Sequence, residues 1–196
     1  MKIAFTSLII FFCFLNARGQ DSLKNFNYSR NNITATGMEV LGSWAIVNLG
    51  VGLAGWAGSK GGENRSFYQM TTIWGGINLA LAIPGRINAL RDEQKTFTPA
   101  ESLKAQQRIE RIFLVNGGLD VVYISAGTFM KIRGDNNNSV QLQGYGSSII
   151  IQGAFLLFFD STMYATQRGN GNKLRRFLLK NPITFNGRQV GMVINM

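Results

Sequence analysis

The chain of 196 residues contains no histidine and a single cysteine, Cys13, which lies close to its N-terminus. Without histidine or further cysteine, the usual ligand sets of zinc, haem and iron–sulfur centres cannot be built. A serine–histidine dyad and a disulfide within the chain are excluded for the same reason, as is any thiol nucleophile beyond Cys13. We therefore expect no metal and no cofactor. Any acid–base chemistry would fall to carboxylates, tyrosine, lysine or arginine.

Charged residues are also scarce, at 15% of the chain, compared with roughly 25% in soluble domains. Mean hydropathy is nevertheless only +0.04, because polar residues gather in loops and a tail while long stretches carry no charge. Glycine is abundant, with 23 residues, and glycine is more frequent in membrane helices than in soluble ones. The composition and length indicate a single integral membrane domain.

The N-terminus has the pattern of a secretory signal peptide. Lys2 provides a short basic start, residues 3–15 form an apolar run, and small residues follow up to Gly19. The alternative is an uncleaved first membrane helix, for which the apolar run is short. We expect a signal peptide at residues 1–19 and a polar, exposed linker at residues 20–35.

Four later segments are each near the roughly 20 residues that a helix needs to cross the hydrocarbon core. In lipid the backbone must form its hydrogen bonds internally, so these segments must be helical if they span. We expect an all-α four-helix transmembrane bundle over residues 36–167; a soluble bundle of unusually apolar helices is the alternative. Gly50, Ala54 and Gly58 form a small-residue stripe that would permit close helix approach. The apolar segments are residues 40–59, 66–85, 112–130 and one within 144–167.

Turn and capping residues mark the ends of these segments. Residues 58–62 and 134–138 are rich in glycine, serine and asparagine, which is typical of turns. Pro84 should end or kink the second segment. Thr98 to Glu101 form a capping box with proline at the first helical position, so a helix should begin there and continue into the third segment.

The C-terminal tail, residues 168–196, is basic and has its own pattern. Residues 173–180 mix basic and apolar side chains, as a short interfacial helix would. Asn186 and the glycine after it lie between residues 183–185 and 188–194, which predicts a small β-hairpin. An isolated hairpin is marginal in water, so this one should pack on the bundle or on a partner.

Two observations give opposite orientations in the membrane. Cleavage of a signal peptide places the mature N-terminus outside, and four spans then return the C-terminus to the same side. Lysine and arginine are concentrated in the second connection and the tail, which the positive-inside rule places in the cytoplasm. In both cases the net charge of +10 flanks membrane spans, so we expect contact with lipid headgroups and no nucleic acid.

Each expected span carries a polar residue near its middle. Ionisable groups inside a membrane are costly and favour a functional hypothesis, here a pocket for an ion, a proton or a small polar ligand. The packing alternative is hydrogen bonding between helices, worth about 0.6 kcal/mol per bond in membranes. The candidate ligand-binding residues are Asn48, Asn78, Asn116, Asp120, Gln152 and Asp160.

The first two segments share a sequence element. Trp44 precedes Asn48 by four residues, and Trp74 precedes Asn78 by the same spacing, with leucine after each asparagine. The third and fourth segments resemble each other more weakly, through an Asn-Gly and a Gln-Gly pair that are each followed by an aspartate. A bundle with such an approximate repeat could bring four amides to one depth.

Residues 38–49, 116–123, 144–146 and 152–160 together carry a resemblance to a known family. The chain resembles an uncharacterised bacterial membrane-protein family, a domain of unknown function, over about residues 36–167. The resemblance implies a four-helix membrane domain in a bacterial cell envelope, with the inner membrane as the expected location. It implies no established activity.

Three hypotheses follow for the function. In the first, a binding or transport-like module uses Asp120, Asp160 and the amides to line a pocket. In the second, a structural or assembly protein uses the same residues to fix helix packing, and its tail docks a membrane-protein partner or a second copy of the chain. The third, an intramembrane enzyme, is the least favoured, because it needs both aspartates close to one substrate or water. The first two differ in whether the six residues converge on one cavity or pair with each other.

Overall fold

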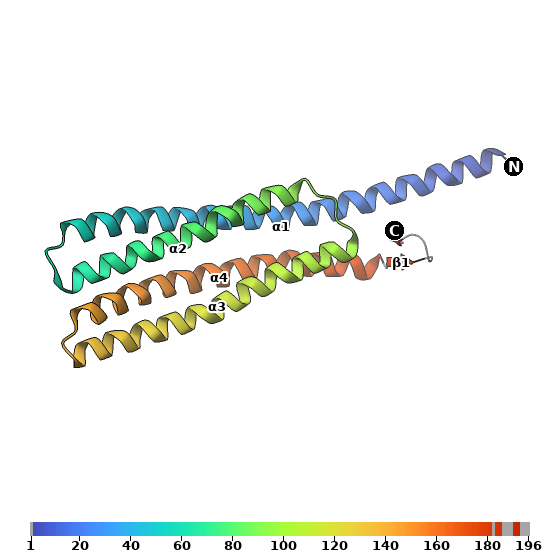
Figure 1. Cartoon of the computed structure of the whole chain (residues 1–196). Coiled ribbons are helices and arrows are strands. Elements are labelled where there is room, and N and C mark those ends of the chain that lie inside the picture. The colour runs from blue at the N-terminus through green and yellow to red at the C-terminus, as the bar shows by residue number, and fades with distance from the viewer. Residues whose placement is uncertain (1, 182, 186–189, 193–196) are drawn as a thin grey trace.

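A computed structural model describes the backbone of residues 2–181, 183–185 and 190–192, and the side chains of residues 22–181. Four long helices follow one another and end in a short antiparallel hairpin (Figure 1). The helices are α1 (Lys2–Gly58), α2 (Gly62–Glu93), α3 (Pro99–Asn136) and α4 (Val140–Lys180), and the strands are β1 (Ile183–Phe185) and β2 (Val190–Met192).

The helices form two antiparallel hairpins, α1–α2 and α3–α4, that lie along each other (Figure 1). The two tight turns lie at one end of the bundle, and the α2–α3 connection lies at the other end. Helix α4 joins the hairpins, because it packs against α2 and α1 as well as α3, whereas α3 has little contact with α1. Helix α2 therefore packs closely against α4, whereas its packing against α3 is looser.

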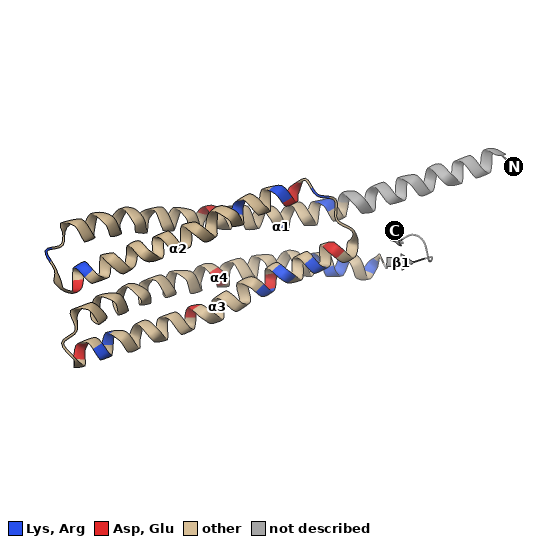
Figure 2. Ribbon diagram, in the orientation of Figure 1, with Lys and Arg blue, Asp and Glu red and all other residues tan. Residues whose placement is uncertain are grey.

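Three helices are long and apolar enough to cross a membrane, namely those containing Ser22–Gly58, Pro99–Asn136 and Val140–Lys180. The second helix packs along α1 and exposes large apolar side chains such as Leu81 and Ile83. Charged residues gather towards the helix ends, most of them near the α2–α3 connection (Figure 2). The expected all-α four-helix bundle of membrane-spanning type is confirmed.

The signal peptide expected at residues 1–19 stays a prediction, because only the backbone of residues 2–21 is described, as part of α1. Residues 20–35 differ from the exposed linker that we expected, since they also belong to α1. Asn27 is buried and donates a hydrogen bond to Ser102 Oγ at 2.8 Å. The carbonyl oxygen of Arg30 accepts one from Gln167 Nε2 at 3.0 Å. These polar residues are ordered by partners on α3 and α4.

Local sequence signals correctly predicted the start of α3 and the turn before α2. At the start of α3, Thr98 Oγ1 accepts from the Glu101 backbone N–H, and the Glu101 carboxylate accepts from the Thr98 backbone N–H, which confirms the capping box. The turn before α2 uses positive φ angles at Gly61 (146°) and Gly62 (74°), where glycine has no steric cost. Pro84, by contrast, lies inside α2 and does not end it.

The C-terminal region matches the expected pattern with one difference. Residues 173–180 are the last turns of α4, continuous with the span, and do not form a separate helix. Strands β1 and β2 pair in an antiparallel register that places Thr184 opposite Gly191, as a hairpin requires. The turn expected at Asn186 falls on residues 186–189, outside the described residues.

The small-residue stripe was assigned to the wrong face of α1. A Cβ added at Gly50 or Gly58 would meet nothing, so neither residue lies at a helix contact. A Cβ at Gly52 would instead lie 2.8 Å from the Thr72 backbone nitrogen, so Gly52 permits the close approach of α2. The buried face of α1 follows Leu41, Ala45, Asn48 and Gly52.

Candidate functional site

Two of the six candidate residues pair with each other. Gln152 Nε2 donates to Asn48 Oδ1 at 2.6 Å, and Trp44 Nε1 donates to Gln152 Oε1 at 2.9 Å. Asn48 Nδ2 donates to the Trp44 carbonyl oxygen at 2.7 Å, and the Trp44 ring stacks on Phe155 at 4.0 Å between centroids. Each amide oxygen and nitrogen thus has a partner. These residues form a lock between α1 and α4, as the packing alternative expected.

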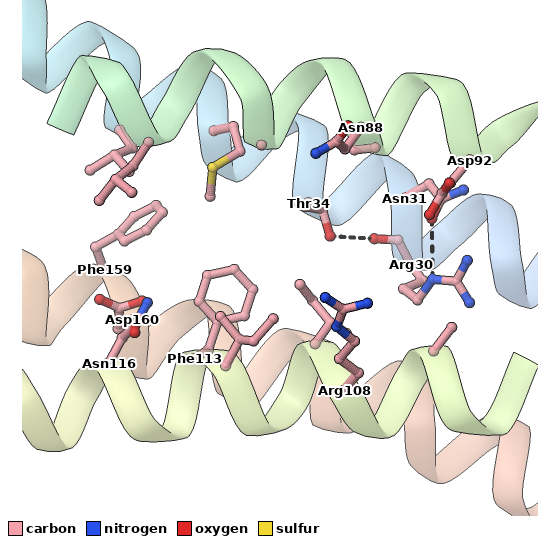
Figure 3. Close-up of a pocket in the computed structure, with 18 of the residues that line it drawn as sticks. Arg30, Asn31, Thr34, Asn88, Asp92, Arg108, Phe113, Asn116, Phe159 and Asp160 are labelled. Carbon is pink, nitrogen blue, oxygen red and sulfur yellow. Dashed lines mark hydrogen bonds between the residues drawn. The ribbon is translucent and has the colours of Figure 1, made fainter. Parts of the chain in front are cut away.

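The other four candidate residues share one cavity. It has a volume of about 880 Å³ and lies between α2 and α3, with walls from all four helices. Figure 3 shows Asn116 and Asp160 at one end of this space and Arg30, Asn31 and Asp92 at the other. The candidate residues that line it are Asn78, Asn116, Asp120 and Asp160.

The cavity has an inner end, an apolar middle and a charged mouth. At the inner end Trp74 and Tyr123 meet edge to face, with ring centroids 5.1 Å apart. These are the lining residues of α2 and α3 that lie furthest from the α2–α3 connection. The middle is lined by Leu41, Leu81, Ile109, Phe113, Leu156 and Phe159. The cations that line the mouth are Arg30, Arg91, Lys95, Lys104 and Arg108.

Two buried aspartates meet near the inner end. Asp120 is 2% exposed and Asp160 is 4% exposed. Their carboxyl groups contact each other, and Asn116 lies beside Asp160. Asp120 Oδ2 and Asp160 Oδ1 are buried without a hydrogen-bond partner among the described residues. Two buried carboxylates in contact repel each other strongly unless a proton or a cation accompanies them.

Asn78 also lines the cavity, about one helical turn from Trp74 on α2. The residue is fully buried, and neither Nδ2 nor Oδ1 has a partner within residues 22–181. Buried amides are nearly always hydrogen-bonded, and leaving one unpaired costs about 1–3 kcal/mol. The inner end therefore presents a free donor, a free amide acceptor and two free carboxyl oxygens to whatever occupies the cavity.

Sequence reasoning missed a second polar cluster, near the α2–α3 connection. Glu110 is 5% exposed and accepts from Arg168 Nη1 at 3.0 Å and from Arg175 Nη1 at 3.2 Å. Gln106 Nε2 donates to the Gln167 carbonyl oxygen at 2.8 Å. The sequence did contain a signal for this cluster: Ser102, Gln106 and Glu110 follow one another at every fourth position of α3, a spacing that places their side chains on one helix face.

The inner end suits a small occupant with few ligands. Within residues 22–181 no group of three or more acidic residues is placed to hold a metal ion. Two carboxyls and two amides can instead share a proton or contact a monovalent cation. The contact between Asp120 and Asp160 also places both aspartates close enough to meet one substrate or water, as an intramembrane enzyme would require.

The fold and this site define a class of protein: a four-helix bundle of membrane-spanning type, with a cavity between α2 and α3 that is polar at its inner end and charged at its mouth. The chain belongs to the family of unknown function DUF6992, whose model matches residues 40–161. The matched region contains all six candidate residues, and the resemblance to an uncharacterised family is confirmed. No curated protein and no solved structure matches the chain. A bacterial inner-membrane location stays a prediction.

Proposed function

We propose that this protein is a membrane binding module that holds a proton or a small monovalent cation at the inner end of its cavity. Asp120 and Asp160 would supply the negative charge, and Asn78 and Asn116 would supply amide groups. One observation carries the proposal: the two carboxyl groups are buried in contact with each other, in a cavity that is also lined by the fully buried amide of Asn78, which has no partner among the described residues. Ionisable groups in such a position commonly mark ion or proton pathways.

The chemistry of these groups favours a proton or a hard cation. Carboxylate and amide carbonyl oxygens suit hard cations, and paired aspartates elsewhere hold one proton between them. Either occupant would offset the repulsion between Asp120 and Asp160. The opening of the cavity between α2 and α3 would give the occupant a route to the inner end.

Ligand-dependent stability tests the proposal. A ligand that binds only the folded state stabilises it, by about 2.7 kcal/mol at a concentration of 100 times Kd. Thermal unfolding of the detergent-purified full chain would be followed in NaCl and in choline chloride of equal ionic strength, each at two pH values. We expect sodium or acidification to stabilise the wild type. The double variant Asp120→Asn with Asp160→Asn should lose this response.

Asp135→Asn provides the matched control, because Asp135 is an exposed carboxylate at the end of α3, outside the cavity. The control should respond as the wild type does. A double variant that keeps the full response to sodium and to pH would refute the proposal. So would a wild type that responds to neither.

The second candidate function is a structural or assembly role. The paired amides of Asn48 and Gln152 favour it, because they hold α1 and α4 together by a buried hydrogen bond. A partner that co-purifies with the full chain, and that is lost on deletion of residues 182–196, would support this role. A stable monomer without a partner would count against it.

A further inference from the structure

The mouth of the cavity carries buried donors without partners. Arg30 is 4% exposed and Asn31 is 3% exposed, and both line the cavity. Among the described residues, Arg30 Nη2 and Asn31 Nδ2 have no hydrogen-bond acceptor. Both groups are donors only. A buried, unsatisfied donor of this kind is costly, so two of them in one cavity indicate a site for an acceptor.

The guanidinium of Arg30 is held in place by its other nitrogens. Nη1 donates to Asn27 Oδ1 at 2.6 Å, and Nε donates to Asn31 Oδ1 at 3.1 Å. The guanidinium also lies over the Phe97 ring, 4.8 Å from its centroid. The same Arg30–Asn31 bond positions the Asn31 amide (Figure 3). The two free donors are therefore preorganised, which favours binding.

Positive charge exceeds negative charge at the mouth. Of the two acidic residues that line it, Asp92 binds Lys95 Nζ at 2.6 Å and Glu101 is engaged by the cap of α3. Asp92 is also near enough to interact with Arg30. Within residues 22–181, the lining cations without a hydrogen bond or ion pair from their side chains are Arg91, Lys104 and Arg108. The mouth thus favours an anion.

The apolar middle of the cavity gives the shape of the ligand. Leu81 and Ile112 line the cavity and are also exposed on the outer surface, so the cavity opens sideways towards lipid. From Arg108 to Asp120 the α3 axis rises about 18 Å at 1.5 Å per residue. This length is close to half of the roughly 30 Å hydrocarbon core, which is the depth of one leaflet.

We propose that the mouth binds the phosphate headgroup of an anionic membrane lipid, and that one acyl chain of this lipid lies along the apolar middle of the cavity. Arg30, Asn31 and Arg108 contact the phosphate oxygens. The acyl chain passes Leu81 and Phe113 and ends before the inner end. This site uses other residues than the proton or cation site, so each can fail without the other.

Native mass spectrometry of the detergent-purified full chain tests the proposal. The probes are phosphatidylglycerol and phosphatidylcholine with the same acyl chains, a six-carbon-chain phosphatidylglycerol, and inorganic phosphate alone. We expect the long-chain phosphatidylglycerol to bind at least about tenfold more tightly than each of the others. Phosphatidylcholine would bring its quaternary ammonium among the cations of the mouth, and the six-carbon lipid and inorganic phosphate would leave the apolar middle of the cavity largely unfilled.

Arg30→Gln and Arg108→Gln should each weaken phosphatidylglycerol binding by about tenfold. Arg108 has an exposed side chain without a partner among the described residues, so its variant keeps the fold even where Arg30→Gln does not. Arg111→Gln is the matched control, since Arg111 is exposed on the same helix but outside the cavity. It should bind as the wild type does.

Three results would overturn the lipid site. Inorganic phosphate or the six-carbon lipid could bind as tightly as the long-chain lipid, which would leave no role for the apolar wall. Phosphatidylcholine could bind equally well, which would leave no role for the surplus charge. Arg108→Gln could bind like Arg111→Gln. The two proposals can be told apart with the double variant Asp120→Asn with Asp160→Asn. It should lose the response to sodium and to pH but still bind the lipid, because the two sites use different residues.

Discussion

The two copies of the Trp-Asn element make a sharp prediction about stability, because one asparagine site is fully bonded and the other is not. The perturbations are Gln152→Leu, which removes the bonding partner of Asn48, and Asn78→Leu. Both changes put an apolar side chain of similar size at a buried position inside the bundle. Gln152→Leu should nevertheless lower the free energy of unfolding, whereas Asn78→Leu should not.

The magnitudes follow from the hydrogen bonds. Gln152 makes two side-chain bonds between α4 and α1, one from Trp44 and one to Asn48. At about 0.6 kcal/mol each, and at most about 1.7, they contribute roughly 1–3 kcal/mol. Gln152→Leu should lower the free energy of unfolding by this amount. Asn78 has no side-chain hydrogen bond to lose among the described residues, so Asn78→Leu should leave the free energy of unfolding unchanged or raise it by up to about 1–3 kcal/mol.

Reversible unfolding of the full chain in bicelles, in choline chloride without added sodium, measures both effects. Asn48→Leu and its combination with Gln152→Leu complete a double-mutant cycle, which should show coupling because the residues touch. Asn78→Leu should at the same time weaken the stabilisation by sodium or by acidification. If Asn78→Leu destabilises the protein as much as Gln152→Leu does, Asn78 serves helix packing. The separation of the six candidate residues into a packing pair and four cavity-lining residues is then wrong.

Two further predictions concern the charged end of the bundle. Thr98→Ala removes the N-cap of α3 and should lower the free energy of unfolding by about 1 kcal/mol, measured by the same unfolding assay; an unchanged value would mean that the cap does not form in the membrane. Glu110→Gln leaves Arg168 and Arg175 without their acidic partner and should lower the free energy of unfolding by roughly 1–3 kcal/mol. Added salt should reduce this difference only slightly, because Glu110 is buried; complete loss of the difference in salt would contradict the buried pairing.

The parts of the fold that the sequence predicted well depend on local chemistry. The capping box at Thr98 and the glycine turn at residues 58–62 act through neighbouring residues, so a pattern is enough to find them. Residues 20–35 could not be assigned in this way, since the side chains of Asn27 and Thr34 bond to Ser102 and Gln167, which are distant in sequence. Gly52 was missed for a similar reason, because only the position of α2 shows which face of α1 is buried.

The candidate site was predictable in composition but not in arrangement. Polar residues in apolar segments pointed to the four candidates that line the cavity, but equally to Asn48 and Gln152, which pair with each other. Asn48 and Asn78 even occur in the same local element. Their difference arises from the neighbouring helices. Asn48 meets Gln152 on α4, whereas Asn78 lines the cavity between α2 and α3.

The position of α4 explains why one site is closed and the other open. Helix α4 packs against both α1 and α2, so its Gln152 reaches Asn48 and its Ser148 reaches Thr71, with 2.9 Å between the two hydroxyl oxygens. Within the described part of the chain, no helix takes the corresponding place between α2 and α3, where Trp74 and Tyr123 close the inner end of the cavity. A bundle built from repeated elements can therefore use one copy for packing and keep the other free to bind. Filling the cavity with protein side chains would satisfy Asn78 and remove the site.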